Sequence, residues 1–265
     1  MKKVLIVLVS IILISTLLVA CTQSGSASVL DKVKKDGKIM VGTSADYPPY
    51  EFVDSTGQKT GFDIELMEEI GKKMGVKVEW VDMPFDSLIA AVKEGKIDVS
   101  ISCFNYSEER AKEVGFSKEY FNSEDSFIAN KDFTGKIEKP EDVAAYKLGV
   151  QSGTTQDTWI KENLIDTNLI KEENVQQYER VDQAALDLEA GRIDILMADY
   201  VPAKALLAAH PGFQMLLHEA IASAGPINIV LPLNDEKIKT EIDKAIDALQ
   251  ADGTIDQLAA KYFGE

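Results

Sequence analysis

The sequence predicts an α/β protein of two lobes, each a sheet covered by helices on both faces, with a ligand cleft between them. Short apolar strands alternate with amphipathic helices along most of the 265 residues. The same order of elements then occurs a second time, followed by a final strand and helix that the second half does not need. We therefore expect the chain to cross between the lobes twice, near residues 121–127 and 221–228, and these two extended crossings to form a hinge.

The N-terminus predicts export and a lipid anchor. A basic pair precedes an apolar run over residues 4–20, which ends in LVAC at Cys21. A secretory signal has this layout, and the run is short for a stable membrane span. The ending resembles the bacterial lipobox, so we expect residues 1–20 to be a signal peptide, Cys21 to be lipidated, and residues 21–36 to form a tether that begins with the flexible stretch TQSGSAS. The alternative, an uncleaved anchor helix, would also place the remaining chain outside the cell.

Each half of the chain is expected to contain three strands and two helices. Strand–helix–strand units form right-handed parallel crossovers, which place helices on both faces of a sheet. In the first half we expect strand 39–43, helix 63–74, strand 78–83, helix 86–94 and strand 97–102, and in the second half strand 147–151, helix 155–164, strand 175–178, helix 183–190 and strand 193–198.

The C-terminal segment is expected to return to the first lobe, because the second half already has its units. It reads as strand 227–233, a helix over 235–251 that Asn234 caps, and a short last helix after Gly253. The expected lobe 1 therefore comprises residues 37–122 and 224–265, and lobe 2 comprises residues 123–223.

A repeated stretch supports the prediction of two lobes. The segments LIAAVKEGKIDVSISC (88–103) and AALDLEAGRIDILMAD (184–199) align at a constant offset of 96 residues. Each reads as an apolar helix, a glycine that ends it, a basic residue, Ile-Asp and a strand. Such a pattern can also recur by chance in α/β proteins. If the repeat is genuine, Cys103 and Asp199 end equivalent strands and lie on opposite walls of the cleft, where ligands of such sheets bind.

The composition argues against several functions. The net charge of −16, which becomes more negative without the lysines of the signal peptide, disfavours binding to nucleic acids or to anionic lipids over a broad surface. With Cys21 assigned to lipid, Cys103 has no disulfide partner, and His210 and His218 are too few for a convincing metal site. No phosphate-binding loop or G-x-S-x-G motif occurs. We expect a monomer that binds a ligand without a cofactor or metal and is not an enzyme.

Arg110 is a candidate ligand-binding residue. Only three of the 28 lysines and arginines are arginines, so lysine supplies the general positive charge. Arg110 follows the end of strand 97–102, and Ser107 is placed to cap the turn that carries it. A planar guanidinium binds a carboxylate with two parallel hydrogen bonds, which lysine cannot do. The alternative is a surface arginine that pairs with Glu109 or Glu113.

The turn QSGTTQ after strand 147–151 is a candidate anion site from the other lobe. Gly153 permits a close backbone approach, and Thr154 and Thr155 offer hydroxyls and free amides at a helix start. Together with Arg110 this turn could hold one carboxylate from both sides. Without such a partner it is only a well-capped helix.

Asp199 is a candidate for binding an ammonium group, because it ends strand 193–198 beside the cleft. Its alternative role is to cap the helix that begins near Pro202. Three aromatic residues that follow strand ends of the first half, Tyr47, Tyr50 and Phe85, could enclose the remainder of a small ligand, although a single aromatic residue is more commonly part of a core.

Taken in order, several motifs resemble the bacterial family 3 solute-binding proteins, the amino-acid receptors of ABC importers. They extend over residues 38–264 and comprise GTSADYPPYEF, GFDIEL, FDSLIAAVKEGKID, SEERAKEVGFS, SGTTQ, AGRIDILMAD and ADGTIDQLAAKYFG. The resemblance implies a type II periplasmic-binding-protein fold that closes on a free α-amino acid. It implies that Arg110 binds the carboxylate with Thr154 and Thr155, that Asp199 binds the ammonium group, and that Tyr47 and Phe85 form aromatic walls.

Three positions bear on ligand specificity. Where the family tends to have Ser or Thr, this chain has Asn105, which can still donate to a carboxylate. Cys103 replaces a glycine or small residue and is expected to be a small apolar wall, with a reactive thiol as the alternative. Relatives with cationic ligands often carry an aspartate where this chain has Ser44, so a neutral polar amino acid is as plausible as lysine or arginine.

The resemblance implies a lipoprotein at the outer face of the cell membrane that binds a polar or charged amino acid and delivers it to a membrane permease. Two alternatives remain open at this stage. One is a secreted dehydratase-type enzyme on the same fold, which would need a buried acid over its substrate. The other is a ligand-sensing subunit of a signalling system.

Overall fold

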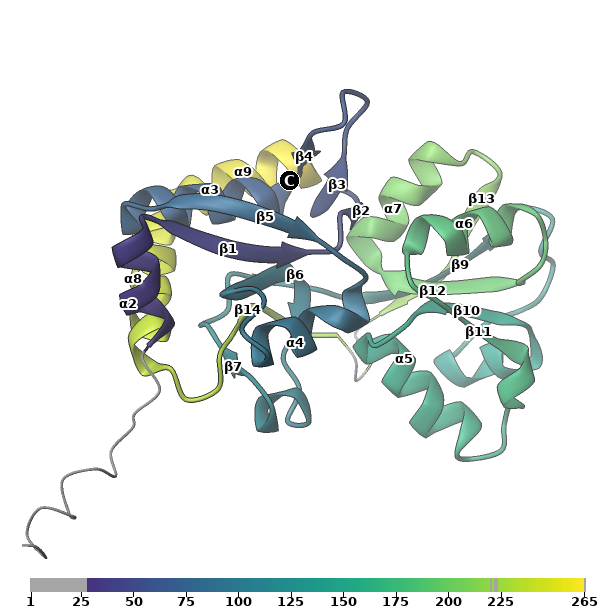
Figure 1. Cartoon of the computed structure of the whole chain (residues 1–265). Helices are drawn as coiled ribbons and strands as arrows, with labels where there is room; N and C mark the ends of the chain where they lie inside the picture. The colour runs from purple at the N-terminus through teal and green to yellow at the C-terminus, as the bar shows by residue number, and fades with distance from the viewer. Residues whose placement is uncertain (1–27, 220, 222–223, 265) are drawn as a thin grey trace, which may run out of the picture.

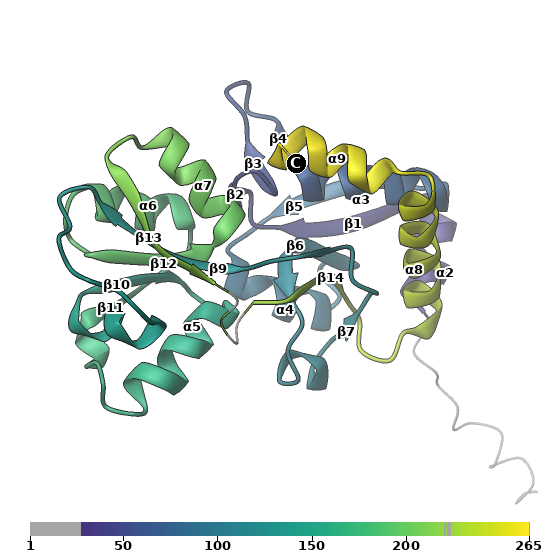
Figure 2. The same ribbon diagram turned by 180° about the vertical axis from the view of Figure 1, so that it is seen from behind.

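The structure, a computed structural model, describes residues 28–219, 221 and 224–264, which form two lobes side by side (Figure 1). The expected signal peptide and Cys21 lie outside these residues. The chain passes from the first sheet to the second between β8 (Phe121–Asn122) and β9 (Asp125–Asn130), and it returns before β14 (Pro226–Leu231) (Figure 2). The prediction of a two-lobed α/β fold is confirmed.

The first sheet holds β14, so the tail does return to the first half of the chain. Its strands β5, β1 and β6 are parallel, and β14 runs antiparallel to β6, to β7 and to β8. The order of the main path is β5 (Lys77–Asp82), β1 (Lys38–Thr43), β6 (Val99–Asn105), β14 and β7 (Gly115–Phe116).

The second sheet has the same plan. β10 is parallel to β11 and β12, and β9 runs antiparallel to both β12 and β13. The order is β11 (Val175–Tyr178), β10 (Leu148–Gln151), β12 (Ile195–Asp199), β9 and β13 (Phe213–Glu219). The lobe boundaries expected from the sequence remain a proposal, and the two sheets divide the strands in the same way.

Helices pack on the sheets, and the buried apolar residues among those described form three clusters, one of which extends across both lobes. A small third sheet, β2 (Asp46–Tyr47), β3 (Glu51–Val53) and β4 (Lys59–Thr60), lies next to the second lobe (Figure 1). The first lobe carries α3 (Phe62–Met74), α4 (Phe85–Lys93), α8 (Glu236–Ala251) and α9 (Thr254–Phe263), and the second carries α5 (Thr155–Ile160), α6 (Val181–Glu189) and α7 (Tyr200–Ala209). The helix expected over 155–164 is α5 followed by a π-helical turn, Lys161–Ile165. No helix among the described residues is long and apolar enough to span a bilayer.

The expected tether is shorter than the sequence indicated. The prediction of a tether over residues 21–36 is wrong for 29–36, because Val29–Asp36 form the helix α2. Val33 is fully buried, and Asp235 accepts hydrogen bonds from the Ser28 hydroxyl at 2.7 Å and from the Val29 amide at 2.7 Å. The helix is therefore attached to the start of α8 and belongs to the body of lobe 1.

The repeated stretch corresponds to a repeated structure. Gly95 and Gly191 adopt left-handed φ values of 69° and 68°, which end the helical segments before them. The aspartates of the two Ile-Asp pairs make equivalent hydrogen bonds. Asp98 accepts a hydrogen bond from the Met40 amide at 2.8 Å, and Asp194 accepts one from the Lys147 amide at 2.8 Å. Each aspartate thereby joins its loop to the first strand of its own sheet, which brings the ends of β6 and β12 to the cleft.

Candidate functional site

A small pocket lies between the lobes at the ends of β6 and β12. In this arrangement of the lobes its free volume is only about 10 Å³, roughly what one water molecule needs, so a larger ligand can enter only when the lobes move apart. Most of the residues that line it are polar, and they come from both lobes. The residues that line it are Ser44, Tyr47, Glu51, Phe85, Ser102, Cys103, Asn105, Arg110, Gln151, Thr154, Thr155, Gln156 and Asp199.

Arg110 reaches this pocket from a short 3₁₀ helix, Arg110–Lys112, whose first amide is bonded to the Ser107 hydroxyl at 3.2 Å. Its guanidinium donates to the Asn105 carbonyl and, across the cleft, to the Gly153 carbonyl, each at 2.8 Å. The group also lies 5.6 Å from the ring centre of Phe85 and 5.4 Å from that of Phe104. Two backbone carbonyls and two aromatic rings therefore fix the orientation of the Arg110 guanidinium.

Arg110 forms no ion pair with any carboxylate of the described residues, although Asp199 and Glu109 act on its charge from a greater distance. Burial lowers the pKa of Arg110 to about 10, which still leaves it protonated at neutral pH. Among the described residues no carboxylate lies within 4 Å of the guanidinium, and Glu113 pairs with Lys93 instead. The surface ion pair considered from the sequence is therefore not formed, and the guanidinium can receive an anion from the pocket.

Asp199 lies on the opposite wall and is 4% exposed. Its Oδ2 accepts the Tyr47 hydroxyl at 2.7 Å, and the same hydroxyl oxygen accepts the Asp199 amide at 2.8 Å. Burial raises the pKa of Asp199, and Tyr47, Ser123 and Gln156 favour its ionised form. Among the described residues, Oδ1 has no hydrogen-bond partner and the side chain does not cap α7. A cationic donor in the pocket would provide the missing partner.

The threonine turn differs in part from the expectation. The Thr154 hydroxyl donates to the Gln151 carbonyl at 2.8 Å and accepts the Asp157 amide at 3.1 Å, so it serves as the N-cap of α5. The Thr155 hydroxyl makes only long contacts of 3.4 Å, one of them to Asn105 across the cleft. It is therefore the more available of the two.

Gly153, a predicted site residue, does not line the pocket. Its φ is 76°, and a side chain there would place Cβ 2.9 Å from Asp86 Cβ of the facing lobe. Its carbonyl also accepts from Arg110. The close approach expected at this glycine is therefore to the other lobe and not to a ligand.

Ser44, Cys103 and Asn105, the three positions expected to bear on specificity, all line the pocket, but each already forms a hydrogen bond within the protein. Asn105 donates to the Ser123 hydroxyl at 2.8 Å, and the Ser44 hydroxyl donates to Asp46 at 2.6 Å. Cys103 is buried with a φ of 49°, and its amide donates to Asp63 at 2.7 Å. Burial raises the pKa of the Cys103 thiol, which supports the interpretation of a small wall over that of a reactive thiol.

The aromatic residues separate into two groups. Tyr47 and Phe85 line the pocket, and Phe85 also stacks on Phe104 with ring centres 4.5 Å apart. Tyr50 does not belong to the site: it is fully buried in lobe 1 beside Phe62 and Phe263. The expectation that Tyr50 helps to enclose the ligand is therefore wrong.

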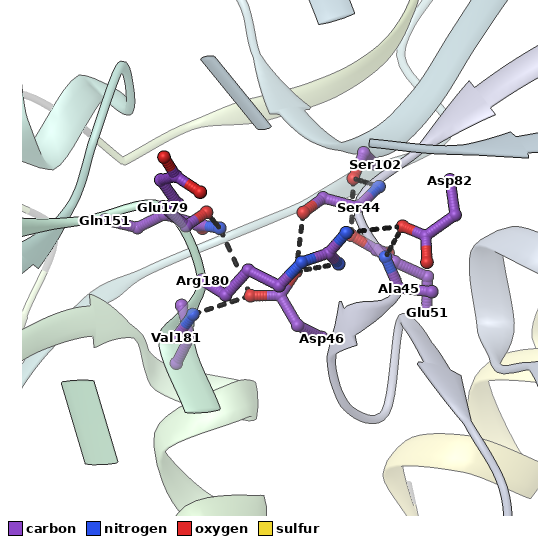
Figure 3. Close-up of polar contacts among 10 residues, drawn as sticks. All are labelled: Ser44, Ala45, Asp46, Glu51, Asp82, Ser102, Gln151, Glu179, Arg180 and Val181. Atoms are coloured by element: carbon purple, nitrogen blue, oxygen red, sulfur yellow. Dashed lines mark hydrogen bonds and ion pairs between the residues drawn. The ribbon is translucent and has the colours of Figure 1, made fainter. Parts of the chain in front are cut away.

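Sequence reasoning missed four polar residues of the lining: Glu51, Ser102, Gln151 and Gln156. The two glutamines begin and end the QSGTTQ turn, and Ser102 precedes Cys103, so neighbours of the chosen residues could have indicated three of them. The Ser102 hydroxyl donates to Glu51 at 2.7 Å and accepts the Ser44 amide at 3.0 Å (Figure 3).

Glu51 and Asp63 form a buried pair of carboxyl groups beneath this lining. Burial raises the pKa of Asp63 to about 7, and burial together with Asp63 raises the pKa of Glu51 well above its usual range. Asp63 accepts the Cys103 amide at 2.7 Å and the Tyr120 hydroxyl at 2.9 Å. One shared proton between the two carboxyls accounts for these shifts, because two like charges this deeply buried repel each other.

The site thus presents an oriented cation and a carboxylate from opposite lobes, separated by a small polar pocket. Among the described residues no cluster of three or more metal-ligating side chains occurs. The arrangement can bind a small molecule that carries an anionic and a cationic group. An α-amino acid has both on one carbon atom.

The sequence matches the family described as bacterial extracellular solute-binding proteins, family 3, over residues 39–265. The chain belongs to this family. It is 35% identical over 225 residues to a probable histidine-binding protein of Campylobacter jejuni, which covers 84% of each chain, and 30% identical over 236 residues to the L-cystine-binding protein TcyJ of Escherichia coli, which covers 89% of this chain and 86% of the relative. Its fold is similar, with a TM-score of 0.79 and 33% identity, to the ancestral amino acid-binding protein AncCDT-1, a precursor of cyclohexadienyl dehydratase; the match covers 89% of this chain and all of that one.

Family membership agrees with the geometry of the site but leaves the ligand of this family 3 protein open, because the two relatives are named for different amino acids. Besides Arg110 and Asp199, polar residues of the lining include Ser44, Glu51 and Ser102 from lobe 1 and Gln151 from lobe 2.

Proposed function

We propose that this protein binds one free polar or charged α-amino acid by closure of its two lobes and delivers it to the membrane permease of an ABC importer. The observation that carries the proposal is that Arg110 and Asp199 line one pocket from opposite lobes, and that among the described residues Arg110 has no ion-pair partner and Asp199 Oδ1 has no hydrogen-bond partner. A ligand that contacts both lobes stabilises the closed form by its differential affinity for that form.

In this proposal the ligand's carboxylate lies against Arg110, with a further donor from the Thr155 hydroxyl, whereas the amide hydrogens of Asn105 stay bonded to Ser123 and Gly225. Its ammonium group lies against Asp199 Oδ1, on the side not taken by the Tyr47 hydroxyl. Phe85 covers the aliphatic carbon atoms, and the ligand's side chain extends toward Ser44, Gln151 and Glu51. Because these three are polar, the proposed ligand has a polar or charged side chain, as have the histidine and cystine named for the two relatives.

The proposed location is the outer face of the cell membrane, with lipid on Cys21. The family is described as extracellular, and the N-terminal sequence is of the signal and lipobox type. Growth with a labelled fatty acid tests the anchor: label on the wild-type protein that is absent from Cys21→Ser supports it, and label retained by that variant excludes it.

The decisive experiment for ligand binding is mass spectrometry of the small molecule that the purified protein carries. The protein is then unfolded, dialysed and refolded, and each of the twenty L-amino acids and L-cystine is titrated into it by calorimetry. We expect one amino acid, or a few of similar side chain, to bind. Absence of binding by all of them would refute the proposal.

A dehydratase is the second candidate, because a protein of similar fold is a precursor of such an enzyme. The buried Glu51 favours it, since the raised pKa of Glu51 keeps a proton available at the pocket wall. A prephenate-type substrate incubated with the protein should yield no product if the protein only binds ligands. Product formation that Glu51→Gln abolishes would establish the enzyme instead.

A sensing role would be indicated by a genomic neighbourhood with a kinase and without a permease and ATPase.

A further inference from the structure

A second set of charged contacts joins the lobes outside the pocket. Arg180 is the residue directly before α6. It donates to Asp82 of lobe 1 at 3.0 Å, and its guanidinium lies 3.6 Å from Asp46 of lobe 1 (Figure 3). None of these three residues lines the ligand pocket. Asp46 is almost completely buried, whereas Arg180 and Asp82 each keep about a quarter of their side chain exposed.

Asp46 also bonds the backbone of lobe 2. Its Oδ2 accepts the Val181 amide, the first of α6, at 2.6 Å and the Gln151 side-chain amide at 3.3 Å, while the Ser44 hydroxyl of its own lobe donates to Oδ1 (Figure 3). A residue of lobe 1 therefore satisfies a free amide at a helix start of lobe 2. Separation of the lobes must break this bond and both contacts of Arg180.

We propose that Asp46, Asp82 and Arg180 form an interlobe latch that stabilises the closed form and sets how tightly the protein retains its ligand. The role of this latch in retaining the ligand rests on the proposed function. Opening the lobes would return Asp46 to water and leave the α6 amide to be hydrated. Residues that touch no ligand thereby contribute to affinity through the equilibrium between open and closed forms.

The extent to which Arg180 stabilises the closed form should depend on whether Asp46 is protonated. The pKa of Asp46 is raised to about 6, chiefly by burial and in smaller part by Asp182, against the lowering effects of Ser44, the Val181 amide and Arg180. Asp82 adds negative charge on the side of lobe 1, whereas the raised pKa of Glu51 keeps that carboxyl protonated. Above pH 6 the buried carboxylate is ionised and needs the guanidinium; below pH 6 it is neutral and does not. The raised pKa also means that acidification favours the closed form, because the open form binds this proton less tightly.

The test compares Arg180→Ala with Arg192→Ala, a matched control whose guanidinium pairs with Asp187 within lobe 2. Spin labels carried by an unnatural amino acid at the exposed positions Leu169 and Leu233, one on each lobe and outside the latch, report the distance between the lobes. The full chain is measured without ligand and with a mixture of the twenty L-amino acids and L-cystine as the probe.

At pH 7.5 we expect Arg180→Ala to lower the closed-to-open ratio about tenfold and to raise the half-closing concentration of the mixture by the same factor. At pH 5 both effects should shrink to about twofold, and Arg192→Ala should have no effect at either pH. Asp82→Asn, which keeps Arg180 in place, should lower the ratio about threefold at pH 7.5. In an Asp46→Asn background the loss of Arg180 should lower the ratio by no more than about threefold, the share that its contact with Asp82 provides.

An unchanged ratio in Arg180→Ala at pH 7.5 overturns the latch, as does a loss of the same size at both pH values, which would indicate damage to α6. The two proposals fail separately. If the amino-acid mixture leaves the wild type open but Arg180→Ala still lowers the ligand-free closed fraction, the latch stands and the proposed function fails. If the mixture closes wild type and Arg180→Ala equally well at pH 7.5, the proposed function stands and the latch fails.

Discussion

The repeated segments of the two lobes are alike in their frame and opposite in the chemistry that they bring to the cleft. In both, an aspartate joins the loop to the neighbouring strand, and a left-handed glycine precedes it. At equivalent positions of the repeat, however, lobe 1 has Cys103, two residues before the end of β6, and lobe 2 has Asp199, the last residue of β12. The cation, Arg110, comes from lobe 1 alone. Similar local frames thus carry different side chains at the cleft, and in the proposed function these side chains bind the two ends of a zwitterion.

The largest effect is expected from removal of the cation. Arg110→Ala should weaken binding of the carried amino acid by more than 100-fold, because the ligand's carboxylate would be desolvated without its partner. Calorimetry on refolded, ligand-free protein measures this. Lys112→Ala, two residues away and exposed, is the control and should bind as the wild type does. Tight binding by Arg110→Ala would mean that the two walls are not complementary in charge.

Removal of the anion should have a somewhat smaller effect. Asp199→Asn keeps an oxygen for the Tyr47 hydroxyl but loses the charge that faces the ammonium group, so we expect about 30-fold weaker binding. Asp166→Asn, which alters an exposed ion pair with Lys161 in the same lobe, serves as the comparison. If Asp199→Asn and Asp166→Asn bind equally well, lobe 2 does not provide the ammonium site.

A third difference between the lobes is the carboxyl pair buried in lobe 1. The pKa of Asp63 is about 7 in the folded state and about 4 in the unfolded chain, so the folded protein binds the proton more tightly. Stability should therefore rise as the pH falls from 8 to 5, by about 2 kcal/mol, and be lost as the pH rises through 7. Urea unfolding at several pH values measures this. In Asp63→Asn the free energy of unfolding should depend less steeply on pH. If its pH dependence is unaltered in that variant, other groups cause it.

The smallest effect concerns the common frame. Nothing lies within 4 Å of a Cβ built on Gly95 or Gly191, so alanine at either position meets only the strain of a positive φ. Each substitution should lower the free energy of unfolding by about 1 kcal/mol, with no change in ligand affinity beyond twofold. Clearly unequal losses, measured by urea unfolding, would show that the two frames are less equivalent than their hydrogen bonds indicate.

The sequence predicted the features that arise from periodicity and local chemistry. The alternation of strands and helices, the repeat, and the positions of Arg110 and Asp199 at strand ends all follow from residues close together in the chain. The use of the Thr154 hydroxyl as a helix cap was less accessible, because the QSGTTQ turn is equally compatible with capping and with ligand binding. The residue range of the tether was also wrong, since α2 depends on its contact with Asp235, about 200 residues away.

What could not be predicted depends on contacts between distant segments. Glu51 and Asp63 lie on different elements and meet only because α3 packs under β3. Arg180 is 98 residues from Asp82 in the chain, and neither residue belongs to a recognisable motif. The scarcity of arginine did provide a signal that was used only for Arg110: of the other two arginines, Arg180 lies between the lobes and Arg192 forms a surface pair.

The most direct test of the central claim is a calorimetric cycle that pairs Arg110 with the ligand's carboxylate. The carried amino acid and its α-carboxamide are each titrated into the wild type and into Arg110→Ala. The wild type should prefer the amino acid by about 100-fold, and the variant should hardly distinguish the two, because the preference arises from the guanidinium. If Arg110→Ala keeps the full preference for the carboxylate, another group binds it, and the assignment of the two walls to the two ends of an amino acid is contradicted.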